Sequence, residues 1–580
     1  MKYIILIIRS FIIIEKKTIK KNIALIEYYL KNINFIEYVF FLFDRNRYNP
    51  IKSKQFKNFI NVNKPIWIKK GINKPKSDHS ILVESFINHP AYNLSNAASL
   101  VYLNALYKMK MVGLVRSNDL KSEVLFRSFG VKSFIFFKHP NIISRIYYIC
   151  KAVILVSKKK NFNNIYKAKY QNIDVGLTAY DSYIRYMRVP TLKKINSDYI
   201  VFLAEALHAC DFISKKIRNF NIKKSIQAET QFTPLNILFQ LCLKNKIEVF
   251  SRSGLENFTI RRFNSWSQRY SNRASISQKI FNEVFIHQKK KCISIVKRKY
   301  QDIIKKKVFG VDEVILGLSK KTTNYIDKKK ILKNFKSKNK KIVVFFLSHL
   351  LDGNFNYGYR NNFQDIYSST KFIIDRLEKF TNVNWIIKKH PNHDFYNSKL
   401  DFQSRLEFLE KKHNHIMLMP ENIDSSSLLK IADVALTISG SVGIEYPSFG
   451  IRSLFFEKSY YSNLNFLNFI NSKKKLLETL KNVHKGKKIK NSLIEKCQVY
   501  LFIKDVLIKN QSTLVPKYIP SRKINENEFW LNASKKVKKF EFSKDEFYQM
   551  FKKQIKCNMR HTLNFNSIKL TEKKYNDFED

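Results

Sequence analysis

The fold is decided by residues 431–456, which read IADVALTISGSVGIEYPSFGIRSLFF. The pattern predicts a buried strand at Val434–Ile438 and then a Gly/Ser turn at Ser439–Gly443. A short helix carrying Glu445 follows, and a second strand at Arg452–Phe456 ends the stretch. Strand, turn, helix and strand in this order are typical of one unit of a parallel α/β sheet.

A turn of this kind predicts a phosphate-binding site. It lies at the carboxyl end of a strand, where the next helix offers backbone N–H groups and the positive end of its dipole. Gly440 and Gly443 lack side chains that would keep a ligand from the backbone, and Ser439 and Ser441 add hydroxyl donors. Glu445 is placed to accept hydrogen bonds from sugar hydroxyls. Parallel sheets also need such turns for purely structural reasons, and this alternative stays open.

Composition limits the class of protein. The chain has 580 residues, of which 44% are hydrophobic, enough for two or three domains with their own cores. The formal charge is +60, but Lys is spread along the whole length among abundant Ile, Asn and Phe, as an AT-rich genome would encode. We therefore predict no nucleic-acid partner, and interpret the charge as favouring an anionic membrane surface or an anionic substrate.

Neither a metal site nor a disulfide framework is predicted, because the six cysteines are far apart and form no CxxC motif or Cys/His cluster. A DxD triplet in a loop is also absent. The apolar run Tyr3–Ile14 is interrupted by Arg9 and lacks a cleavage site, so we predict a strand there and no signal peptide. No run reaches the roughly 18 apolar residues of a membrane span. These features predict a cytoplasmic protein.

The alternation of strands and helices continues outward from residues 431–456. Upstream, in the same domain, it predicts strands at Ile342–Leu347, Asn384–Lys388 and Ile416–Met419, and helices at Phe363–Phe380, Ser398–Lys412 and Ser425–Ile431. An earlier series predicts strands at Ile81–Glu84, Met111–Val115, Ser133–Phe137, Ile173–Val175, Ser225–Ala228 and Ile247–Phe250. Its helices are predicted at Ser95–Met109, Asp119–Phe129, Ile142–Val156, Asp198–Ile217 and Pro234–Cys242. Such βαβ repeats form parallel sheets.

The fold class predicted is therefore α/β, with two Rossmann-like domains facing across a cleft and a helical C-terminal extension. The boundaries predicted are a basic N-terminal segment (1–78), a first Rossmann-like domain (79–320), a basic linker (321–341), a second Rossmann-like domain (342–500) and the extension (501–580). Ligands of such domains bind at the carboxyl edges of the sheets.

Further candidate residues follow the predicted strands. Lys388 and His390 end a strand of the second domain, in the run Lys-Lys-His-Pro, and are able to neutralise a departing phosphate. Two other His-Pro pairs make the dipeptide itself a weak signal. Glu84 ends a predicted strand, and Asp352 and Asp181 lie in segments that follow predicted strands. All three are candidates for the base that deprotonates an acceptor. The alternatives are an Asp-Gly turn for Asp352 and helix caps for all three.

Three segments together resemble bacterial capsule and surface-polysaccharide biosynthesis proteins, which are GT-B type glycosyltransferases related to the capsular Kdo transferases. They read NWIIKKHP (384–391), ADVALTISGSVGIE (432–445) and YDSYIR (180–185). The resemblance implies that His390 and the Ser439–Gly443 turn hold the donor phosphate. It implies that Glu445 holds the nucleotide ribose or the sugar.

The resemblance further implies transfer of a sugar from a nucleotide sugar to a glycan or lipid-linked acceptor, without a metal or other cofactor. The first domain would bind the acceptor, and the protein would associate with the inner membrane surface. CMP-sugar transferases carry an acidic-acidic-Gly motif for the base, whereas Leu351-Asp352-Gly353 has one acid and lies in a different domain, so the catalytic base is left unassigned. A CDP-glycerol-type polyol-phosphate transferase, a sugar-nucleotide 2-epimerase and a non-catalytic basic scaffold remain alternatives.

Overall fold

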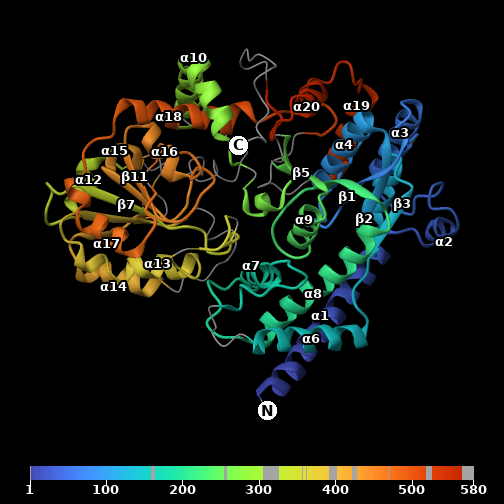
Figure 1. The fold of residues 1–580 in the computed structure, drawn as a ribbon, viewed down its shortest axis with the longest axis horizontal. Helices are drawn as coiled ribbons and strands as arrows, with labels where there is room; N and C mark the ends of the chain where they lie inside the picture. Colours follow the sequence, from blue (N-terminus) through green and yellow to red (C-terminus); the bar gives the residue numbers. More distant parts are fainter. Residues whose placement is uncertain are drawn as a thin grey trace. The chain divides into compact units, whose positions relative to one another are not determined.

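Two compact units, each built on a β-sheet, make up the chain in the computed structural model (Figure 1). The structure describes residues 2–72, 74–158, 164–253, 258–272, 274–304, 326–355, 357–360, 362–390, 402–420, 423, 427–467, 469–516 and 525–564. Unit 1 comprises Met1–Tyr183, Lys193–Arg269 and Lys509–Leu563, and unit 2 comprises Ile184–Leu192, Tyr270–Ile508 and Asn564–Asp580. Each unit is an α/β structure with a parallel-sheet core, as predicted.

The sheet of unit 1 has six strands in the order β3-β2-β1-β4-β5-β6. All neighbouring strands are parallel except β5 and β6, which are antiparallel. The strands are β1 (Ser77–Glu84), β2 (Met109–Arg116), β3 (Ser133–Phe137), β4 (Ile222–Gln227), β5 (Glu248–Ser253) and β6 (Thr259–Phe263). The last five residues of the central strand β1 are buried, since helices cover both faces of the sheet.

Helices of unit 1 begin where the sequence offers a capping side chain. The side chains of Asp119, Asn141 and Asn196 each accept a hydrogen bond from a backbone N–H in the first turn of α5, α6 and α8. The helices are α1 (Lys2–Asn32), α2 (Phe35–Phe43), α3 (Lys54–Lys69), α4 (Pro90–Tyr107), α5 (Leu120–Ser128), α6 (Ile142–Ser157), α8 (Ser197–Arg218), α9 (Leu235–Lys244), α19 (Glu526–Lys538) and α20 (Glu546–Lys556). Helix α7 (Val175–Met187) belongs to unit 1 as far as Tyr183.

The C-terminal helices α19 and α20 return to the beginning of the chain and pack on α3 and α4 (Figure 1). The ring of Trp530 lies 4.8 Å from that of Phe56 and 5.1 Å from that of Phe59. The ring of Tyr102 on α4 lies 5.4 Å from that of Phe547 on α20. These contacts join α3 and α4 to α19 and α20 in one hydrophobic core.

Two predicted strands of unit 1 are wrong. Residues Tyr3–Ile14 belong to the 31-residue helix α1, because their β-branched isoleucines recur at helical spacing as well as in a run. Ile173 makes only an isolated bridge with Tyr170, and Val175 begins α7. A Cβ on Gly176 would lie 2.3 Å from the carbonyl oxygen of Ile165, so this glycine serves close packing of the helix start.

The sheet of unit 2 has five parallel strands in the order β11-β10-β7-β8-β9. They are β7 (Ile342–Phe346), β8 (Asn384–Lys388), β9 (Ile416–Leu418), β10 (Val434–Thr437) and β11 (Arg452–Phe455), and each coincides with a predicted strand to within one or two residues. The chain runs from β7 through β8 to β9 and then returns to the other side of β7 as β10.

Alternate residues of β7 enter two different cores. Val343 and Phe345 face one core, with α13 (Ile366–Ile374), α14 (Gln403–Lys412) and α17 (Lys473–Lys481) (Figure 1). Ile342 and Val344 face the other, with α12 (Lys328–Lys333), α15 (Leu428–Ile431) and α16 (Val442–Ser448). The two faces follow from the period of two along a strand and explain its unbroken apolar sequence.

Several elements were not predicted, and α10 and β6 are two of them. Helix α10 (Gln278–Ile304) packs against α18 (Asn491–Phe502), and its buried Cys292, Val296 and Tyr300 recur every four residues among many lysines. Strand β6 carries two buried arginines, and Arg262 pairs with Glu248 of β5 at 2.5 Å. In both cases the charged residues obscure the apolar pattern in the sequence, although the segment packs against a neighbouring element.

Candidate active site

The carboxyl edge of the unit 2 sheet brings the ends of three strands into one row. Thr437 of β10 pairs with Phe346 of β7, and Phe346 pairs with Lys388 of β8. Strand order reverses between β7 and β10, which is the place where parallel sheets open a crevice for ligands. Two residues beyond the row lie Ser439 and His390, each in a stretch that the sequence singled out.

Two imidazole rings meet at this edge. The ring of His349, which follows β7, lies 5.4 Å from the ring of His390, which follows β8, with 52° between their planes. His349 is 5% exposed and His390 is partly exposed. Lys388 is buried at the end of β8, where its carbonyl oxygen accepts a hydrogen bond of 3.0 Å from the N–H of Leu347. Pro391 of the predicted motif lies outside the described residues.

The Ser439–Gly443 turn is held from one side by the segment that follows β11. The hydroxyl of Tyr461 donates a hydrogen bond of 2.7 Å to the carbonyl oxygen of Gly440. The hydroxyl of Ser459 donates one of 2.7 Å to the carbonyl oxygen of Ser439. Both carbonyl oxygens are thereby held by side chains of the protein, which give the turn a defined shape.

The two glycines of the turn make room for protein atoms. A Cβ on Gly443 would lie 1.9 Å from the hydroxyl oxygen of Tyr461, and a Cβ on Gly440 would lie 2.8 Å from Oγ1 of Thr437. The N–H of Gly440 donates to Oγ1 of Thr437, and that of Gly443 donates to the carbonyl oxygen of Gly440. The glycine N–H groups are therefore used inside the turn, which leaves those of Ser441 and Val442 as candidate donors to a ligand.

Glu445 lies on α16, one turn beyond Ser441, and is 8% exposed. Burial raises its pKa and Asp505 adds to the rise, whereas Lys504 and the hydrogen bond from the Ser441 hydroxyl oppose it. Lys504 and Asp505 lie in a π-helical turn (Ile503–Leu507), a local geometry found frequently at functional sites.

The acidic and basic groups behind Glu445 form a compact network. Nζ of Lys504 donates a hydrogen bond of 2.9 Å to one oxygen of Asp505, and the hydroxyl of Tyr300 donates one of 3.0 Å to the other. Burial works against the charge of Lys504, but Asp505 and Glu445 outweigh it and raise the pKa of this amine. A protonated Lys504 close to Glu445 balances part of the negative charge at this end of α16.

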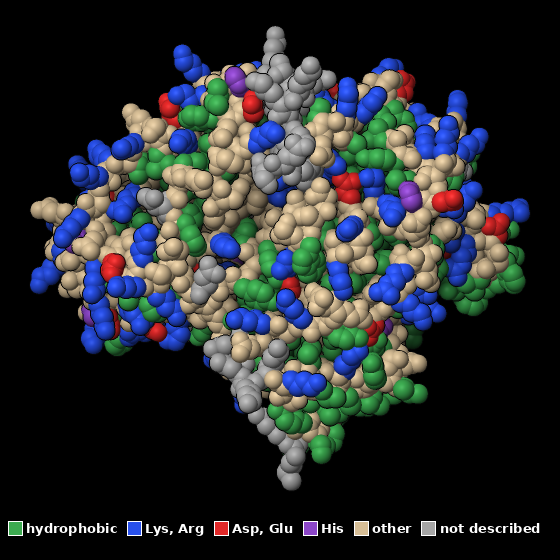
Figure 2. Space-filling model, in the orientation of Figure 1, with side chains coloured by type: hydrophobic (Ala, Val, Ile, Leu, Met, Phe, Trp, Pro, Cys, Tyr) green, Lys and Arg blue, Asp and Glu red, His purple; other side chains and the backbone are tan. Residues whose placement is uncertain are grey.

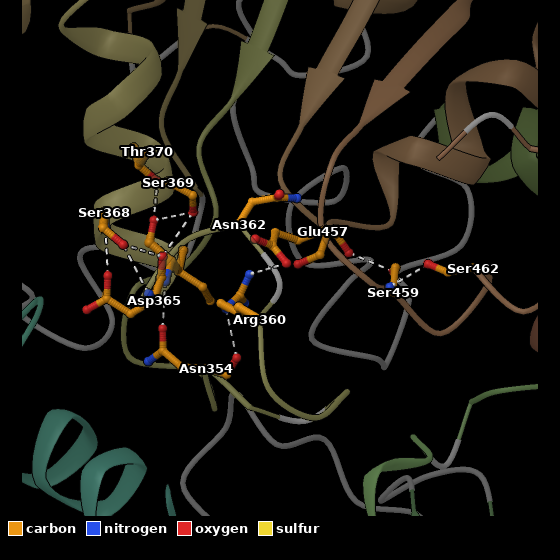
Figure 3. Close-up of polar contacts among 12 residues, drawn as sticks. Asn354, Arg360, Asn362, Asp365, Ser368, Ser369, Thr370, Glu457, Ser459 and Ser462 are labelled. Carbon is orange, nitrogen blue, oxygen red and sulfur yellow. Dashed lines mark hydrogen bonds and ion pairs between the residues drawn. The ribbon is translucent and has the colours of Figure 1, made fainter. Parts of the chain in front are cut away.

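The loop after β7 is tied to the segment after β11 (Figure 3). Nη1 of Arg360 lies 3.7 Å from Oε2 of Glu457, and both side chains are nearly inaccessible. Nε of Arg360 donates a hydrogen bond of 3.0 Å to the carbonyl oxygen of Asn354. These contacts position the two loops that border the edge between β7 and β10.

Asp352 is exposed in the same loop, and Gly353 follows it with a φ of 40°. The positive φ of Gly353 fits the Asp-Gly turn offered as the alternative, but the helix that follows is capped by another residue. Asp365 forms a capping box with Ser368 at the start of α13 (Figure 3). Asp352 is thus the candidate acid that is open to solvent.

Glu84, the candidate base in unit 1, is fully buried at the end of β1. Its carboxylate accepts hydrogen bonds from the N–H groups of Phe86 (2.6 Å) and Ala228 (2.7 Å) and from the side chain of Asn96 (3.2 Å). Burial raises its pKa, whereas these hydrogen bonds and Arg252 lower it. These contacts join the ends of β1 and β4, so they give Glu84 a structural role. The role of Glu84 as a base stays a prediction.

Asp181, the second candidate in unit 1, is 5% exposed and lies within α7. The sequence placed it in a loop after a strand at Ile173–Val175, and that strand is absent. Asp181 is therefore neither a helix cap nor a residue at the end of a strand.

Among the described residues, no group of three or more His, Cys, Asp or Glu side chains is arranged to hold a metal ion.

Sequence reasoning missed the residues that hold the site in shape. They are His349, Arg360, Glu457, Ser459, Tyr461, Lys504 and Asp505. One signal was available: the polar run Glu457–Ser462 follows the last strand of the sheet directly, at the same edge as the turn. The interactions of Lys504 with Glu445 and of Asp505 with Tyr300 depend on tertiary packing and have no local pattern.

Comparisons with known proteins give weak likenesses. No protein-family profile matches the chain, and no curated protein matches it significantly. Among solved structures, the chain is similar to the KpsC beta Kdo 2,4 transferase of Thermosulfurimonas dismutans, with 9% identity over 48% of this chain and 79% of that one and a TM-score of 0.27.

Two further solved structures show the same level of likeness. A UDP-GlcNAc 2-epimerase from Neisseria meningitidis has 13% identity over 79% of this chain and 97% of its own, with a TM-score of 0.22. A glycosyltransferase from Rickettsia africae has 10% identity over 80% and 99%, with a TM-score of 0.23. Scores this low carry no argument about activity, which must rest on the residues of this chain.

Proposed function

We propose that this protein is a glycosyltransferase that moves a sugar from a nucleotide sugar to a surface polysaccharide or a lipid-linked glycan. Unit 2 would bind the donor, with a CMP-linked sugar as the first to test, and unit 1 would bind the acceptor. The observation that carries the proposal is the alignment of Thr437, Phe346 and Lys388 at one edge of the unit 2 sheet.

This alignment supports donor binding because it gathers groups suited to a diphosphate or phosphate. His349, Lys388 and His390 supply imidazole and ammonium groups at the ends of β7 and β8. The Ser439–Gly443 turn supplies hydroxyl and N–H donors at the end of β10. Hydrogen bonds from charged or preorganised donors are the main way in which proteins hold phosphate oxygens.

The same groups account for departure of the nucleotide. In the transfer, the bond between the anomeric carbon and the donor phosphate oxygen breaks, and the phosphate keeps the electron pair. His390 and Lys388 would stabilise the charge that develops on that oxygen. The acceptor hydroxyl forms the new bond and gives its proton to a base.

The base is assigned with less structural support than the donor site. Of the three predicted acids, Asp352 is exposed, whereas Glu84 and Asp181 are buried. Asp352 also lies on the loop that borders the edge between β7 and β10. We therefore place it first as the group that takes the proton, and keep Glu84 and Asp181 as the other candidates.

A donor panel tests the proposal. The purified protein would be incubated with CMP-Kdo, UDP-GlcNAc and CDP-glycerol, each with and without a glycan acceptor, and nucleotide release would be measured. The proposal expects release that depends on the acceptor and yields a glycosylated product. Product formed without an acceptor would indicate an epimerase, and transfer from CDP-glycerol alone would indicate a polyol-phosphate transferase.

Matched variants connect the activity to the site. His390→Ala should lower transfer by about 10²-fold, the usual loss for an electrostatic contact to a developing anion. His287→Ala, at an exposed position on α10, should leave transfer unchanged. Equal activities of the two variants would rule out His390 as a donor-binding residue.

A further inference from the structure

Helix α1 has two apolar faces. One face packs within unit 1, where α1 contacts α6 and α8. On this face Ile14 is 6% exposed, and the hydroxyl of Ser10 donates a hydrogen bond of 3.1 Å to the carbonyl oxygen of Ser197. Glu15 forms a bidentate ion pair with Arg145 of α6, with N–O distances of 2.6 and 2.8 Å. The helix is therefore fixed to the body of unit 1.

The other face is open to solvent although it is apolar. Its side chains recur at intervals of three, four or seven residues, so they form one stripe along the helix. With exposed fractions of 46 to 74%, the stripe consists of Ile4, Ile8, Ile12, Ile19, Ile23, Ile26 and Leu30. A 31-residue helix is about 46 Å long, so the stripe runs over most of that length.

Basic side chains line one border of this apolar stripe. Arg9, Lys16, Lys20 and Lys31 are all exposed, and at 100° per residue they fall along one border of the stripe. The whole of α1 contains seven Lys or Arg and two Glu. An apolar stripe bordered by lysine is the pattern of a helix that lies in the surface of an anionic membrane.

Neighbouring helices add exposed apolar side chains. On α2, which follows α1 directly, Phe35, Ile36 and Phe43 are 69 to 85% exposed. On α6, which packs against α1, Ile142 and Ile143 are 55 and 78% exposed. Figure 2 shows hydrophobic side chains gathered with blue Lys and Arg over the region where Figure 1 draws α6. Monomeric proteins rarely expose so many large apolar side chains together.

We propose that the exposed face of α1, with α2 and α6, docks on the surface of a bilayer that contains anionic lipid. Charge complementarity selects this partner over a second copy of the chain, because two copies of formal charge +60 would bring the basic borders of their stripes together. No described helix is long and apolar enough to cross a membrane, so the proposal is for a helix that lies in the interface.

Vesicle flotation with the full-length protein tests the proposal. Wild-type protein should float with vesicles of phosphatidylcholine and phosphatidylglycerol, and bind vesicles of phosphatidylcholine alone less strongly. Ile12→Glu with Ile23→Glu should lower the partition coefficient by about tenfold or more, since charge replaces buried apolar side chains. Lys16→Glu with Lys20→Glu should lower binding to the anionic vesicles by a similar factor.

A control and a competing outcome make the test decisive. Ile286→Glu changes an isoleucine that is 70% exposed on α10 and should bind vesicles like wild type. Circular dichroism would verify that each variant is folded. Equal flotation of wild type and the Ile12/Ile23 variant would overturn the proposal. A lipid-independent dimer that the same variant splits, seen by light scattering, would also overturn it and identify the face as a contact between copies.

Discussion

The hydroxyl of Tyr461 lies at the place where Gly443 has no side chain. It donates a hydrogen bond of 2.7 Å to the carbonyl oxygen of Gly440, and a Cβ on Gly443 would lie 1.9 Å from its oxygen. The glycine and the tyrosine thus depend on each other, and together they give the turn after β10 its shape. The chemistry proposed for this edge requires that shape.

Gly443→Ala should destabilise the protein by about 1–3 kcal/mol, because the new methyl group overlaps a tyrosine that a hydrogen bond holds in place. Tyr461→Phe should cost about 1 kcal/mol for the lost hydrogen bond. The double variant should lose less than the sum, since phenylalanine has no hydroxyl to meet the methyl group. Denaturant unfolding of all four proteins measures this coupling, and strictly additive losses would contradict it.

Glu445 should make stability depend on pH. Burial raises the pKa of its carboxyl, so the folded state holds the proton more tightly than the unfolded chain does. Its contribution to stability is fully present below the unfolded pKa of about 4.3 and is lost as pH rises through the folded pKa. Glu445→Gln does not titrate, so its stability relative to wild type should increase from pH 4 upward and then level off.

Denaturant unfolding of both proteins between about pH 4 and 8 measures this difference. Glutamine keeps the shape of the side chain and an acceptor for the hydroxyl of Ser441. A stability difference that stays constant, or that decreases as pH rises, would show that Glu445 has no raised pKa in the folded protein.

Removal of one partner from the buried ion pair of Arg360 and Glu457 should lower the stability of the protein, because the other charge stays buried without its partner. Arg360→Met removes the cation 3.7 Å from Glu457 and should destabilise the protein by about 3 kcal/mol at neutral pH. Burial already raises the pKa of Glu457, and loss of Arg360 should raise it further, so the variant should lose less stability at pH 5 than at pH 8.

A double variant, Arg360→Met with Glu457→Gln, serves as the matched control for this pair. It has no buried charge at this position, so it should recover part of the stability and lose the extra dependence on pH. Unfolding in denaturant at the two pH values measures both effects. A double variant less stable than Arg360→Met at neutral pH would contradict the assignment of a buried ion pair.

The sequence was sufficient to predict the five strands of the unit 2 sheet. Its central strands β7, β8 and β10 are buried on both faces, so their apolar runs, such as Ile342–Phe346, stand out from the flanking polar loops. The turn at Ser439–Gly443 and the strand end at Lys388 could be placed at one edge for the same reason. Parallel topology then decides which strand ends meet.

The features that the sequence did not predict correctly depend on contacts between residues far apart in the chain, which leave no local pattern. Helix α1 was predicted as a strand because a short run of isoleucines fits both periods, and only its length distinguishes them. Gly443 was interpreted as space for a ligand, whereas Tyr461, 18 positions later, occupies that space. Glu84 was interpreted as a base, and its three hydrogen-bond partners lie between 2 and 144 residues away along the chain.

Nucleotide binding to wild type and His390→Ala, measured by thermal shift with CMP, CDP, UDP and GDP, tests the central claim most directly. A nucleotide that binds at the edge of β7, β8 and β10 and is present at about 100 times its dissociation constant should stabilise wild type by roughly 2.7 kcal/mol. The account predicts this shift for at least one nucleotide and its loss in His390→Ala, with His287→Ala like wild type. No shift with any nucleotide, or an equal shift in both histidine variants, would contradict it.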